Sequence, residues 1–509
     1  MLRKIRIFLA VTVFTLVTLL FLDFTGTLHL WFGWLAKIQL IPAILAVNIV
    51  AIIILLLTGI FGRVYCSVIC PLGIMQDGIS NLAGRRKGKK SRFGYSKAKN
   101  WLRYSLLVLF VVALVAHITA ISTLLDPYAA YGRIASNLFA PIYRSGNNLL
   151  ALFAERVDSY AFYSTDVWIK SCTVFGVAIA TLAVVGILAW RNGRTYCNTI
   201  CPVGTLLGSV TINPICHLFK ITFDVDKCTG CELCERNCKA SCLNSKEHKI
   251  DYSRCVTCFN CIEKCKSGAI NYKLRPFGKK KKVETTTVSV QSDNDGLSRR
   301  SVLSLLGILA AGQAIRAQQQ APLLNVDGGL APIEDKIAPA RQTPIVPPGA
   351  ESLRNMKNHC TACQLCVSAC PNSVLRPSKK TATFMQPEMS FEKGYCRPEC
   401  IECSSVCPTG AIKSVTAAQK SVIAVGSAVW IEKNCIVLRD NVQCNLCEVK
   451  CAPQAIVMRK LEPEKRNSLE VPVIDKEKCT GCGACEYLCP ARPFSAIYVE
   501  GNVRHHEIW

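Results

Sequence analysis

The chain has 509 residues, 31 of them cysteine, and its formal net charge is +25. This length suggests three or four domains. The basic excess would suit nucleic acid, but the Lys and Arg residues gather beside apolar segments. Membrane topology therefore explains the charge better, and we expect no nucleic-acid partner. The cysteines fall into regular runs, which points to metal binding.

Four apolar stretches lie in the first 190 residues, and each approaches the ~20 residues that a helix needs to cross a bilayer. The first would also suit a signal peptide, but no small-residue cleavage site follows it and three more stretches do. We therefore expect residues 1–215 to form an α-helical membrane domain with four spans. These are Ile7–Leu22, Leu40–Ile60, Tyr104–Leu125 and Thr173–Trp190.

Charge predicts the orientation of these spans, because short loops rich in Lys and Arg remain in the cytoplasm. Residues 1–6 and the loop Gly84–Arg92 are strongly basic, whereas the loop Asp126–Lys170 is balanced in charge. This pattern places the N-terminus and the chain after the fourth span in the cytoplasm. We expect a multi-pass protein of a bacterial inner membrane.

One loop motif occurs twice, at Gly62–Gly73 and at Gly193–Gly204, each just after an even-numbered span. Both loops should therefore lie at the cytoplasmic surface, and a pseudo-repeat of two helix pairs would bring them together. Their four thiolates could hold an additional [4Fe–4S] cluster or a metal ion. The alternative is disulfides, which the cytoplasm disfavours. The cysteines are Cys66, Cys70, Cys197 and Cys201.

Residues 216–277 contain two C-x2-C-x2-C-x3-C runs, the spacing of a bacterial two-cluster ferredoxin, in which each fourth cysteine crosses to the other cluster. We expect an α+β ferredoxin-like domain. A zinc ribbon is the rival interpretation, but four-ligand zinc does not need the third and fourth cysteines of a run. The expected ligands are Cys228, Cys231, Cys234 and Cys238, and then Cys255, Cys258, Cys261 and Cys265.

This ferredoxin region departs from the usual pattern at several positions. Lys239 and Lys266 stand where a proline usually follows the fourth cysteine. Cys242 follows the first run and could replace Cys238 as a ligand. We interpret Cys242 as structural, like Cys172 and Cys216, because free buried cysteines behave as small apolar residues.

The chain then changes character. Residues 278–297 are basic and polar, as in a disordered linker. Residues 298–320 place Arg299 and Arg300 before a short apolar run, which is typical of a twin-arginine export signal or of a fifth anchor. The plainer alternative is a basic flank before a short helix. Residues 321–350 are rich in proline and suit an extended spacer.

Residues 351–509 contain four further runs, whose sixteen cysteines make four sets of four with none left over. This arithmetic predicts a four-cluster polyferredoxin domain that depends on its cofactors for folding. A disulfide-rich exported module is the alternative. The runs are Cys360, Cys363, Cys366, Cys370; Cys396, Cys400, Cys403, Cys407; Cys435, Cys444, Cys447, Cys451; and Cys479, Cys482, Cys485, Cys489.

With its two Arg-x-Tyr-Cys-x3-Cys-Pro loops followed by ferredoxin runs, the segment of residues ~1–275 resembles the NapH family of membrane quinol dehydrogenase components. Its loop signature is shared with relatives that assist cytochrome oxidase assembly or nitrous oxide reductase maturation. Residues ~297–500 resemble the exported NapG/MauM ferredoxin-type family. This second resemblance implies that the outer two runs pair with each other and the inner two likewise. Cys489 would then join the first run, Cys370 the fourth, Cys451 the second and Cys407 the third.

The resemblance implies electron transfer from membrane quinol to a periplasmic reductase or its electron carrier. Residues ~216–297 would be cytoplasmic and ~320–509 periplasmic, with six [4Fe–4S] clusters and a seventh at the repeated loops. The alternatives are a maturation factor that reduces a metal centre in a partner enzyme, and electron entry from a cytoplasmic donor to quinone. Clusters on both sides leave ~30 Å of hydrocarbon to be bridged.

Quinol oxidation also needs a proton acceptor beside an apolar pocket at the bilayer edge. The sequence offers four candidates, although a lone histidine in a helix more often serves packing. They are His29, His117, Asp126 and Asp77.

Overall fold

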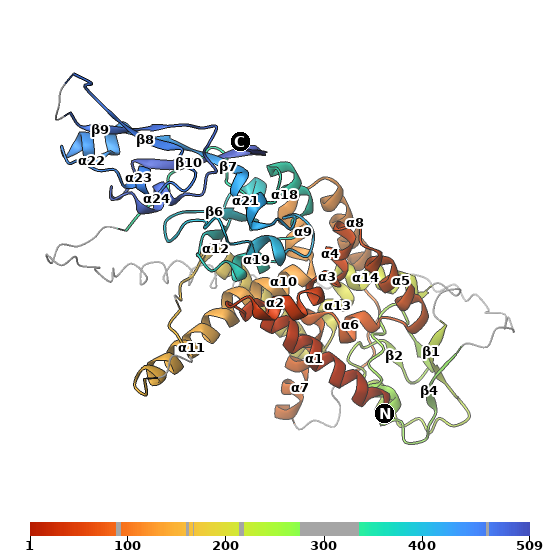
Figure 1. Ribbon diagram of the computed structural model, residues 1–509. Coiled ribbons are helices and arrows are strands. Elements are labelled where there is room, and N and C mark those ends of the chain that lie inside the picture. The colour runs from red at the N-terminus through yellow and green to blue at the C-terminus, as the bar shows by residue number, and fades with distance from the viewer. Residues whose placement is uncertain are drawn as a thin grey trace, which may run out of the picture. The chain divides into compact units, whose positions relative to one another are not determined.

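The computed structural model describes residues 1–87, 93–158, 162–165, 167–212, 218–274, 335–464 and 468–508. Residues Met1–Leu274 and Ile337–Trp509 form one compact unit, drawn in Figure 1. The predicted linker 278–297, the twin-arginine segment 298–320, the start of the spacer and Cys216 lie outside the described residues.

Helices dominate the first 212 residues. The longer ones are α1 (Leu2–Leu22), α5 (Ile49–Phe61), α7 (Pro71–Lys87), α8 (Asn100–Val115), α11 (Ala140–Glu155), α12 (Cys172–Asn192) and α14 (Pro202–Ile212). The shorter ones are α2 (Thr27–Phe32), α3 (Trp34–Lys37), α4 (Leu40–Leu45), α6 (Val64–Val68), α9 (Thr119–Leu125), α10 (Pro127–Ile134) and α13 (Thr195–Thr199), with a π-helical turn at Ala135–Phe139.

Two of these helices, α1 and α12, are long and apolar enough to cross a membrane. The prediction of four continuous spans needs correction, because the second and third are each broken in two. Val47 (φ 50°) separates α4 from α5, and His117 (φ 54°) separates α8 from α9. A side-chain-bearing residue in the left-handed region cannot continue a right-handed helix. The side chain of Asn48 then caps α5 by accepting from the Val50 N–H.

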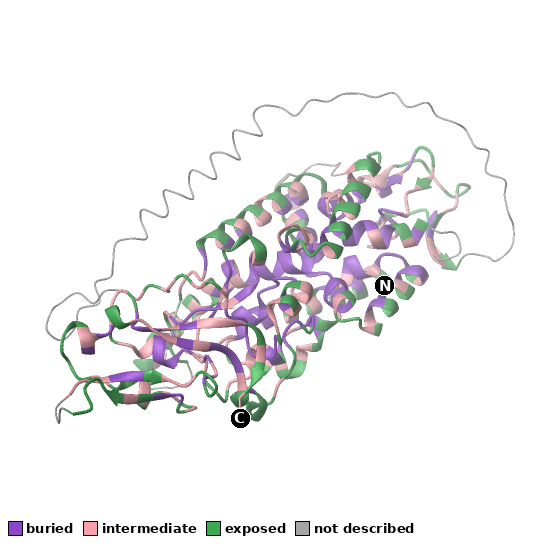
Figure 2. Cartoon of the chain, turned by 90° about the horizontal axis from the view of Figure 1, so that it is seen from above, coloured by how far each residue is buried: buried purple, intermediate pink, exposed green. Residues whose placement is uncertain are grey.

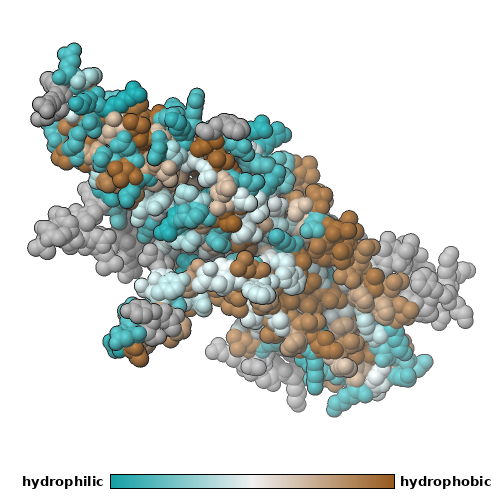
Figure 3. Space-filling model, viewed as in Figure 1, coloured by the Kyte–Doolittle hydropathy of each residue, from teal (hydrophilic) through white to brown (hydrophobic). Residues whose placement is uncertain are grey.

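The outer faces of these helices are apolar. Ile52 and Leu56 on α5, and Val108 and Val112 on α8, are all exposed. Figure 3 shows hydrophobic surface gathered over this helical region, while the surface of the ferredoxin parts is largely hydrophilic. A contiguous apolar surface of this kind marks contact with a membrane or with a partner.

The helices pack as two similar halves. Helix α1 packs on α6 and α7, and α8 packs in the same way on α13 and α14. Helix α7 then packs against α12 of the other half, and α14 packs against α5. This exchange brings the two repeated loops together, which confirms the predicted pseudo-repeat.

A small ferredoxin-like layer follows. Strands β1 (Phe219–Phe223) and β4 (Ile270–Leu274) pair antiparallel, with Ile221 opposite Tyr272. Strands β2 (Leu243–Asn244) and β3 (Lys249–Ile250) form a second short ladder. Two one-turn helices, α15 (Leu233–Arg236) and α16 (Asn260–Lys264), carry the third cysteine of each run.

The C-terminal region repeats this pattern. Its helices are α18 (Leu353–His359), α19 (Leu365–Ala369), α20 (Glu402–Ser405), α21 (Ala417–Val422), α22 (Ile436–Arg439), α23 (Leu446–Val449) and α24 (Ala484–Leu488), with 3-10 turns at Thr381–Thr383 and Glu432–Asn434. Its antiparallel pairs are β5 (Leu375–Pro377) with β6 (Pro387–Met389), β7 (Ile423–Trp430) with β10 (Ile497–Glu507), and β8 (Ile456–Lys460) with β9 (Glu470–Ile474).

One hydrophobic core contains residues of α1, the repeated loops, the inner ferredoxin and the first two C-terminal runs. Figure 2 shows buried residues along the middle of the compact unit. Two smaller cores surround the third and fourth runs. The expected spacer is not free at its end, because Ile345 and Val346 are buried and the Ile345 carbonyl accepts from the Met389 N–H at 2.8 Å.

Candidate metal centres

Four of the six cysteine runs share a local backbone geometry. In the two inner runs, the residues on both sides of the second cysteine are left-handed: Gly230 and Glu232 in the first, Thr257 and Phe259 in the second. The same occurs at Ala362 and Gln364, and at Gly481 and Gly483. These turns wrap the chain tightly around the thiols before each short helix begins, and glycine adopts such conformations without strain.

The inner ferredoxin exchanges its fourth cysteines between the two runs, as its spacing predicts. Burial raises the pKa of Cys234 to about 11, and the neighbouring Cys231 and Cys265 thiols contribute. Burial also raises the pKa of Cys261, with contributions from Cys258, Cys255 and Cys238. Cys265 therefore lies with the first run and Cys238 with the second.

The three extra cysteines differ from one another. Cys242 is buried as expected, and its Sγ lies 3.6 Å from the Sγ of Cys238, which makes it a fifth thiol beside the second inner set. Cys172 is exposed, so its interpretation as a buried residue is wrong. It occupies the first residue of α12, where the helix has not yet entered the packed core.

The sixteen C-terminal cysteines form four groups, but the predicted pairing of runs is wrong. Burial raises the pKa of Cys363 to about 12, and the Cys407 thiol of the second run contributes to this shift, whereas Cys489 does not. One pocket is lined by Cys370 together with Cys396, Cys400 and Cys403. Another is lined by Cys489 together with Cys435, Cys444 and Cys447. Cys451 accompanies Cys479, Cys482 and Cys485.

Neighbouring runs therefore pair, first with second and third with fourth. Cys370 does not join the fourth run, Cys489 the first, Cys451 the second, or Cys407 the third. The reason is local: adjacent runs exchange their fourth cysteines through short connections, as in the inner ferredoxin.

The donor set fits iron–sulfur clusters better than single ions. A tetrahedral zinc ion with Zn–S bonds of about 2.3 Å would draw four sulfurs to within about 4 Å of one another. Throughout the described ranges, no group of three or more Cys, His, Asp or Glu side chains could hold a single metal ion. Two of the C-terminal thiol groups instead surround pockets, as an iron–sulfur core requires.

We therefore expect the purified chain to contain about 24 iron atoms and as many acid-labile sulfides, or about 28 with a cluster at the repeated loops. Colorimetric iron and sulfide analysis, combined with EPR of the reduced protein, measures this directly. Zinc at about one ion per run without sulfide would contradict the assignment.

The two repeated loops form a closed thiol site. Cys66, Cys70, Cys197 and Cys201 are each 4% exposed, so the four thiols are buried inside the protein. The inner ferredoxin covers them, because the backbone N–H of Arg194 donates to the Lys239 carbonyl at 2.9 Å.

Each loop receives an arginine from the other half. The Arg63 guanidinium donates to the Cys197 carbonyl at 3.4 Å, and the Arg194 guanidinium donates to the Cys66 carbonyl at 2.6 Å. A Cβ atom added to Gly73 would lie 2.5 Å from Arg194 Nη1, and one on Gly204 would lie 2.7 Å from Arg63 Nη2. The glycine after the second cysteine of each loop therefore makes room for the arginine of the other loop.

Polar hydrogens also point at the loop sulfurs. The Gln76 amide donates to Cys197 Sγ at 3.1 Å, and the Gly204 N–H donates to Cys201 Sγ at 3.4 Å. Arg63 Nη2 lies 3.8 Å from Cys66 Sγ, and Arg194 Nη1 lies 3.9 Å from Cys197 Sγ. Such donors suit thiolates bound to a metal core.

Asp77 lies in a buried ionic cluster beside this site. Its carboxylate contacts Arg194 at 2.8 Å, Arg6 at 2.5 Å and Lys239 at 3.3 Å. Burial opposes ionisation, yet these three cations hold the pKa of Asp77 well below its ordinary value. Asp77 therefore stays charged and is poorly suited to accept protons. Lys239, which replaces the usual proline, supplies one of the three cations.

We expect Asp77→Asn to destabilise the protein strongly, because three buried cations lose their only carboxylate among the described contacts. Breaking a buried ion pair from one side typically costs about 3–5 kcal/mol. The measurement is thermal unfolding of the cluster-loaded chain. Asp440→Asn, which removes an exposed partner of Arg439, should leave the melting temperature unchanged. Equal melting temperatures for both variants would contradict this role of Asp77.

The structure separates the four candidate proton acceptors. His29 lies on α2 and is half-buried. Asp126 is buried and caps α10 by accepting from the Tyr128 and Ala129 N–H groups at 3.0 and 3.3 Å. Burial raises the pKa of Asp126 to about 6. His117 and Asp126 line one small pocket with Ser122 and Cys360. The structure thus brings two of the four together, next to a cluster cysteine.

Sequence reasoning did not identify Arg63, Arg194, Gln76 or Lys239 as parts of the site. The signal for the two arginines was present, since both belong to the repeated motif. Nothing in the sequence marked Gln76, because the equivalent position of the second half is Leu207.

Comparison with known families agrees with these sites. A family model described as a 4Fe-4S binding domain matches residues 43–90 and 173–211, which contain the two repeated loops. A second, described as a 4Fe-4S dicluster domain, matches residues 359–411 and 442–492. In the second model, the segment 359–411 contains the first and second C-terminal runs, and the segment 442–492 contains the fourth run and all of the third except Cys435. The chain is therefore a multi-domain iron–sulfur electron-transfer protein of the ferredoxin type.

Curated relatives define the family further. The methylamine utilization ferredoxin-type protein MauM of Methylobacillus flagellatus is 31% identical over 167 residues, which are 32% of this chain and 70% of the relative. The ferredoxin-type protein NapG of Escherichia coli K12 is 30% identical over 212 residues, 36% of this chain and 87% of the relative. The ferredoxin-type protein NapF of the same organism is 27% identical over 159 residues, 31% and 87% respectively. The chain belongs to the family of ferredoxin-type proteins that includes MauM and NapG. No solved structure matches it.

Proposed function

We propose that this chain is a membrane-bound electron-transfer protein of the quinol dehydrogenase type. It takes electrons from membrane quinol and passes them to a periplasmic reductase or its electron carrier. The observation that carries the proposal is the position of the repeated-loop thiols, between the inner ferredoxin and the first C-terminal runs in one packed core.

Direct contacts join the repeated loops to the inner ferredoxin. Arg63 donates to the Ser253 carbonyl at 2.9 Å, and the Asn198 amide donates to the Ala240 carbonyl at 3.1 Å. Ser253 and Ala240 each lie two residues from a cysteine of the second inner set, Cys255 and Cys238. That set therefore faces the repeated loops.

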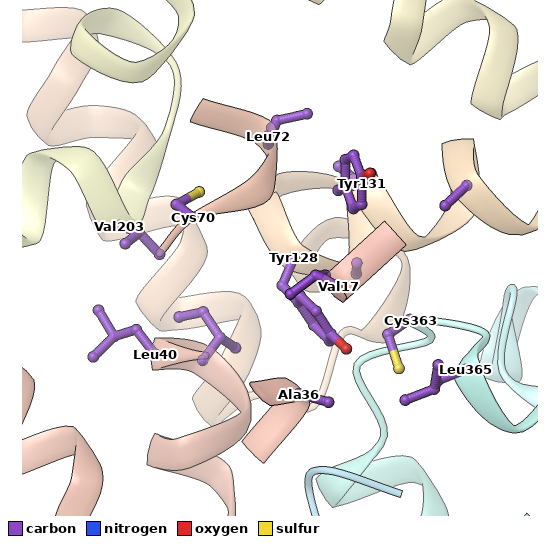
Figure 4. Close-up of a cluster of buried hydrophobic side chains, with 14 of the residues drawn as sticks. Val17, Ala36, Leu40, Cys70, Leu72, Tyr128, Tyr131, Val203, Cys363 and Leu365 are labelled. Carbon is purple, nitrogen blue, oxygen red and sulfur yellow. The ribbon is translucent and has the colours of Figure 1, made fainter. Parts of the chain in front are cut away.

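The first C-terminal run contacts the helical region through α10. A Cβ atom on Gly132 would lie 2.3 Å from the Cys363 carbonyl, so α10 and the first C-terminal run are in close contact. In the close-up of Figure 4, Tyr128 and Val17 lie between Cys70 and Cys363. The gap between the loop thiols and the first C-terminal group is thus filled by packed side chains.

The length of helix α1 indicates the distance between the inner ferredoxin and the first C-terminal run. Arg3, near its start, contacts Asn260 and Glu263 of the inner ferredoxin, and α1 also packs against α19. Phe21, in the last turn of α1, lies beside Gly132, which the Cys363 carbonyl also approaches. The 21 residues of α1 correspond to about 30 Å, the thickness of a hydrocarbon core. This supports a chain with ferredoxin sets toward both faces of a membrane, the inner one cytoplasmic and the C-terminal one periplasmic. A site at the repeated loops would divide the distance that electrons must cross.

In the proposed reaction, quinol binds beside the pocket of His117 and Asp126 and is oxidised to quinone, releasing two electrons and two protons. The Asp126 carboxylate takes up the first proton, the second passes to water, and the two electrons leave one at a time to the iron–sulfur groups. Cys360 in the same pocket belongs to the first C-terminal group. The iron–sulfur clusters supply one-electron transfer when bound. The chain contributes their spacing, the exclusion of water around them and the charges that tune them.

A second direction of flow has one observation in its favour. Cys231 of the first inner set is exposed, so that set is open to a soluble cytoplasmic donor that would send electrons inward to quinone. A third candidate, a maturation factor for a partner enzyme, has the same electron path and differs only in the acceptor.

The deciding experiment uses the full chain in sealed inverted membrane vesicles under anaerobic conditions. A soluble quinol analogue should reduce the clusters at a rate that stopped-flow absorbance can follow. In a separate experiment, protease added outside intact spheroplasts should cleave residues 335–508. Clusters that respond only to a reduced cytoplasmic donor would favour the second direction. Protection of residues 335–508 would overturn the proposed arrangement.

A further inference from the structure

Among the described residues, four arginines are almost fully buried, and two of them, Arg63 and Arg194, lie at the repeated-loop thiols, where the proposed electron path does not explain them. They are 0% and 1% exposed, respectively. Burying a guanidinium is costly unless it is paired or hydrogen-bonded, so two such residues at one thiol site require a compensating partner.

The two arginines are compensated differently. Arg194 Nε contacts the Asp77 carboxylate at 2.8 Å, so its charge is neutralised directly. The acceptors of Arg63 are neutral: Asn198 Oδ1 at 3.1 Å, the Ser253 carbonyl at 2.9 Å and the Cys197 carbonyl at 3.4 Å. Within the described ranges, no carboxylate forms an ion pair with Arg63.

The remaining partner for the Arg63 charge is the thiol site itself. Arg63 Nη2 lies 3.8 Å from Cys66 Sγ. Four thiolates around a [4Fe–4S] core carry a net charge of about −2 when oxidised and about −3 when reduced. A fixed positive charge in a low-dielectric interior stabilises the reduced form more than the oxidised one.

We propose that Arg63 raises the reduction potential of a cluster held by Cys66, Cys70, Cys197 and Cys201. Arg194 contributes less, because Asp77 offsets its charge. The asymmetry between the two halves of the repeat makes Arg63 the tuning residue. This inference rests on the proposed cluster at the repeated loops, and it does not depend on quinol as the electron donor.

The test is an EPR-monitored redox titration of the purified full chain, with Arg63→Gln compared to wild type. At the wild-type midpoint potential of the loop cluster, the variant should show at least a tenfold lower ratio of reduced to oxidised cluster. For a one-electron couple this is a downward shift of about 59 mV. The signals of the other clusters should not move.

Arg103→Gln is the matched control. Arg103 is also buried and also donates to the Ser253 carbonyl, at 3.1 Å, but no hydrogen bond joins it to a cysteine in the described structure. Its removal should leave the loop cluster's ratio within about twofold of wild type. A shift as large as that of Arg63→Gln would overturn the specific role of Arg63.

Two further variants keep the test decisive if Arg63→Gln loses iron. Asn198→Asp leaves Arg63 in place and adds a carboxylate beside it, as Asp77 does for Arg194, so the potential should fall. Arg63→Lys keeps the charge and should remain close to wild type. A fall in Arg63→Lys as large as in Arg63→Gln would show that charge is not the cause.

The loop cluster's own signal is identified as the one missing from Cys66→Ser. If no signal is missing, the cluster proposed at the loops is absent and the inference falls with it. If a signal is missing but Arg63→Gln and Asn198→Asp leave its potential unchanged, the cluster stands and the inference alone is wrong.

Discussion

Asp126→Asn is expected to slow quinol-dependent reduction of the clusters by about two orders of magnitude or more, while reduction by dithionite stays unchanged. Removing a group that accepts a proton in the rate-limiting step typically costs about 10²–10⁴ in rate. The fold should survive, because asparagine caps helices as well as aspartate does and can still accept from the Tyr128 N–H. Stopped-flow absorbance measures both rates, with a quinol analogue as reductant for the first and dithionite for the second.

The matched control is Asp23→Asn. Asp23 is also buried, and its carboxylate also holds backbone N–H groups, those of Thr25 at 2.9 Å and Leu28 at 2.9 Å. It does not line the pocket of His117 and Asp126. If both variants slow quinol oxidation equally, the effect is structural and Asp126 is not the proton acceptor.

The pH dependence follows from the pKa of Asp126, which burial raises to about 6. Above this pH the carboxylate is ionised and can take a proton from quinol; below it the carboxyl is already protonated and cannot. The wild-type rate should therefore fall as the pH drops through about 6, and the Asp126→Asn rate should lack this step.

The cysteine spacing predicted most of the candidate sites, because ligand spacing is a local property of the chain. The inner exchange of Cys238 and Cys265 follows from run geometry alone. The predicted pairing of the C-terminal runs is wrong because it rests on the family resemblance and not on the spacing of the runs. The rule that worked for the inner ferredoxin, applied again, would have placed Cys370 with the second run and Cys407 with the first.

The helix breaks and the crossed arginines lay beyond sequence reasoning for different reasons. Val47 and His117 interrupt apolar runs that contain neither a proline nor a glycine at the break. Hydropathy alone therefore predicts one continuous helix across each of these positions. Arg63 and Arg194 stand in a visible repeat, but their function depends on the exchange of α7 and α14 between halves, which is a tertiary property. Lys239 was visible only as a departure from pattern, and Asp77, its partner, lies 162 positions earlier in the chain.

Removing the repeated-loop site should disconnect the two ferredoxin regions. In Cys70→Ser/Cys201→Ser, electrons supplied to the inner ferredoxin by a reduced dye outside inverted vesicles should reach the C-terminal clusters at least about a hundredfold more slowly. The reason is distance: without the site, transfer must cross most of the roughly 30 Å that α1 spans in one step. The iron content should fall by about four atoms per chain.

Cys172→Ser is the control for this double variant, since Cys172 is an exposed thiol outside every group and its loss should change neither rate nor iron. The inner-to-outer rate is measured by following the C-terminal EPR signals after rapid freezing. An unchanged rate in the double variant, with four irons lost, would mean that the loop site is present but lies off the electron path. An unchanged rate with no iron lost would mean that these four thiols, although buried together, never hold a cluster.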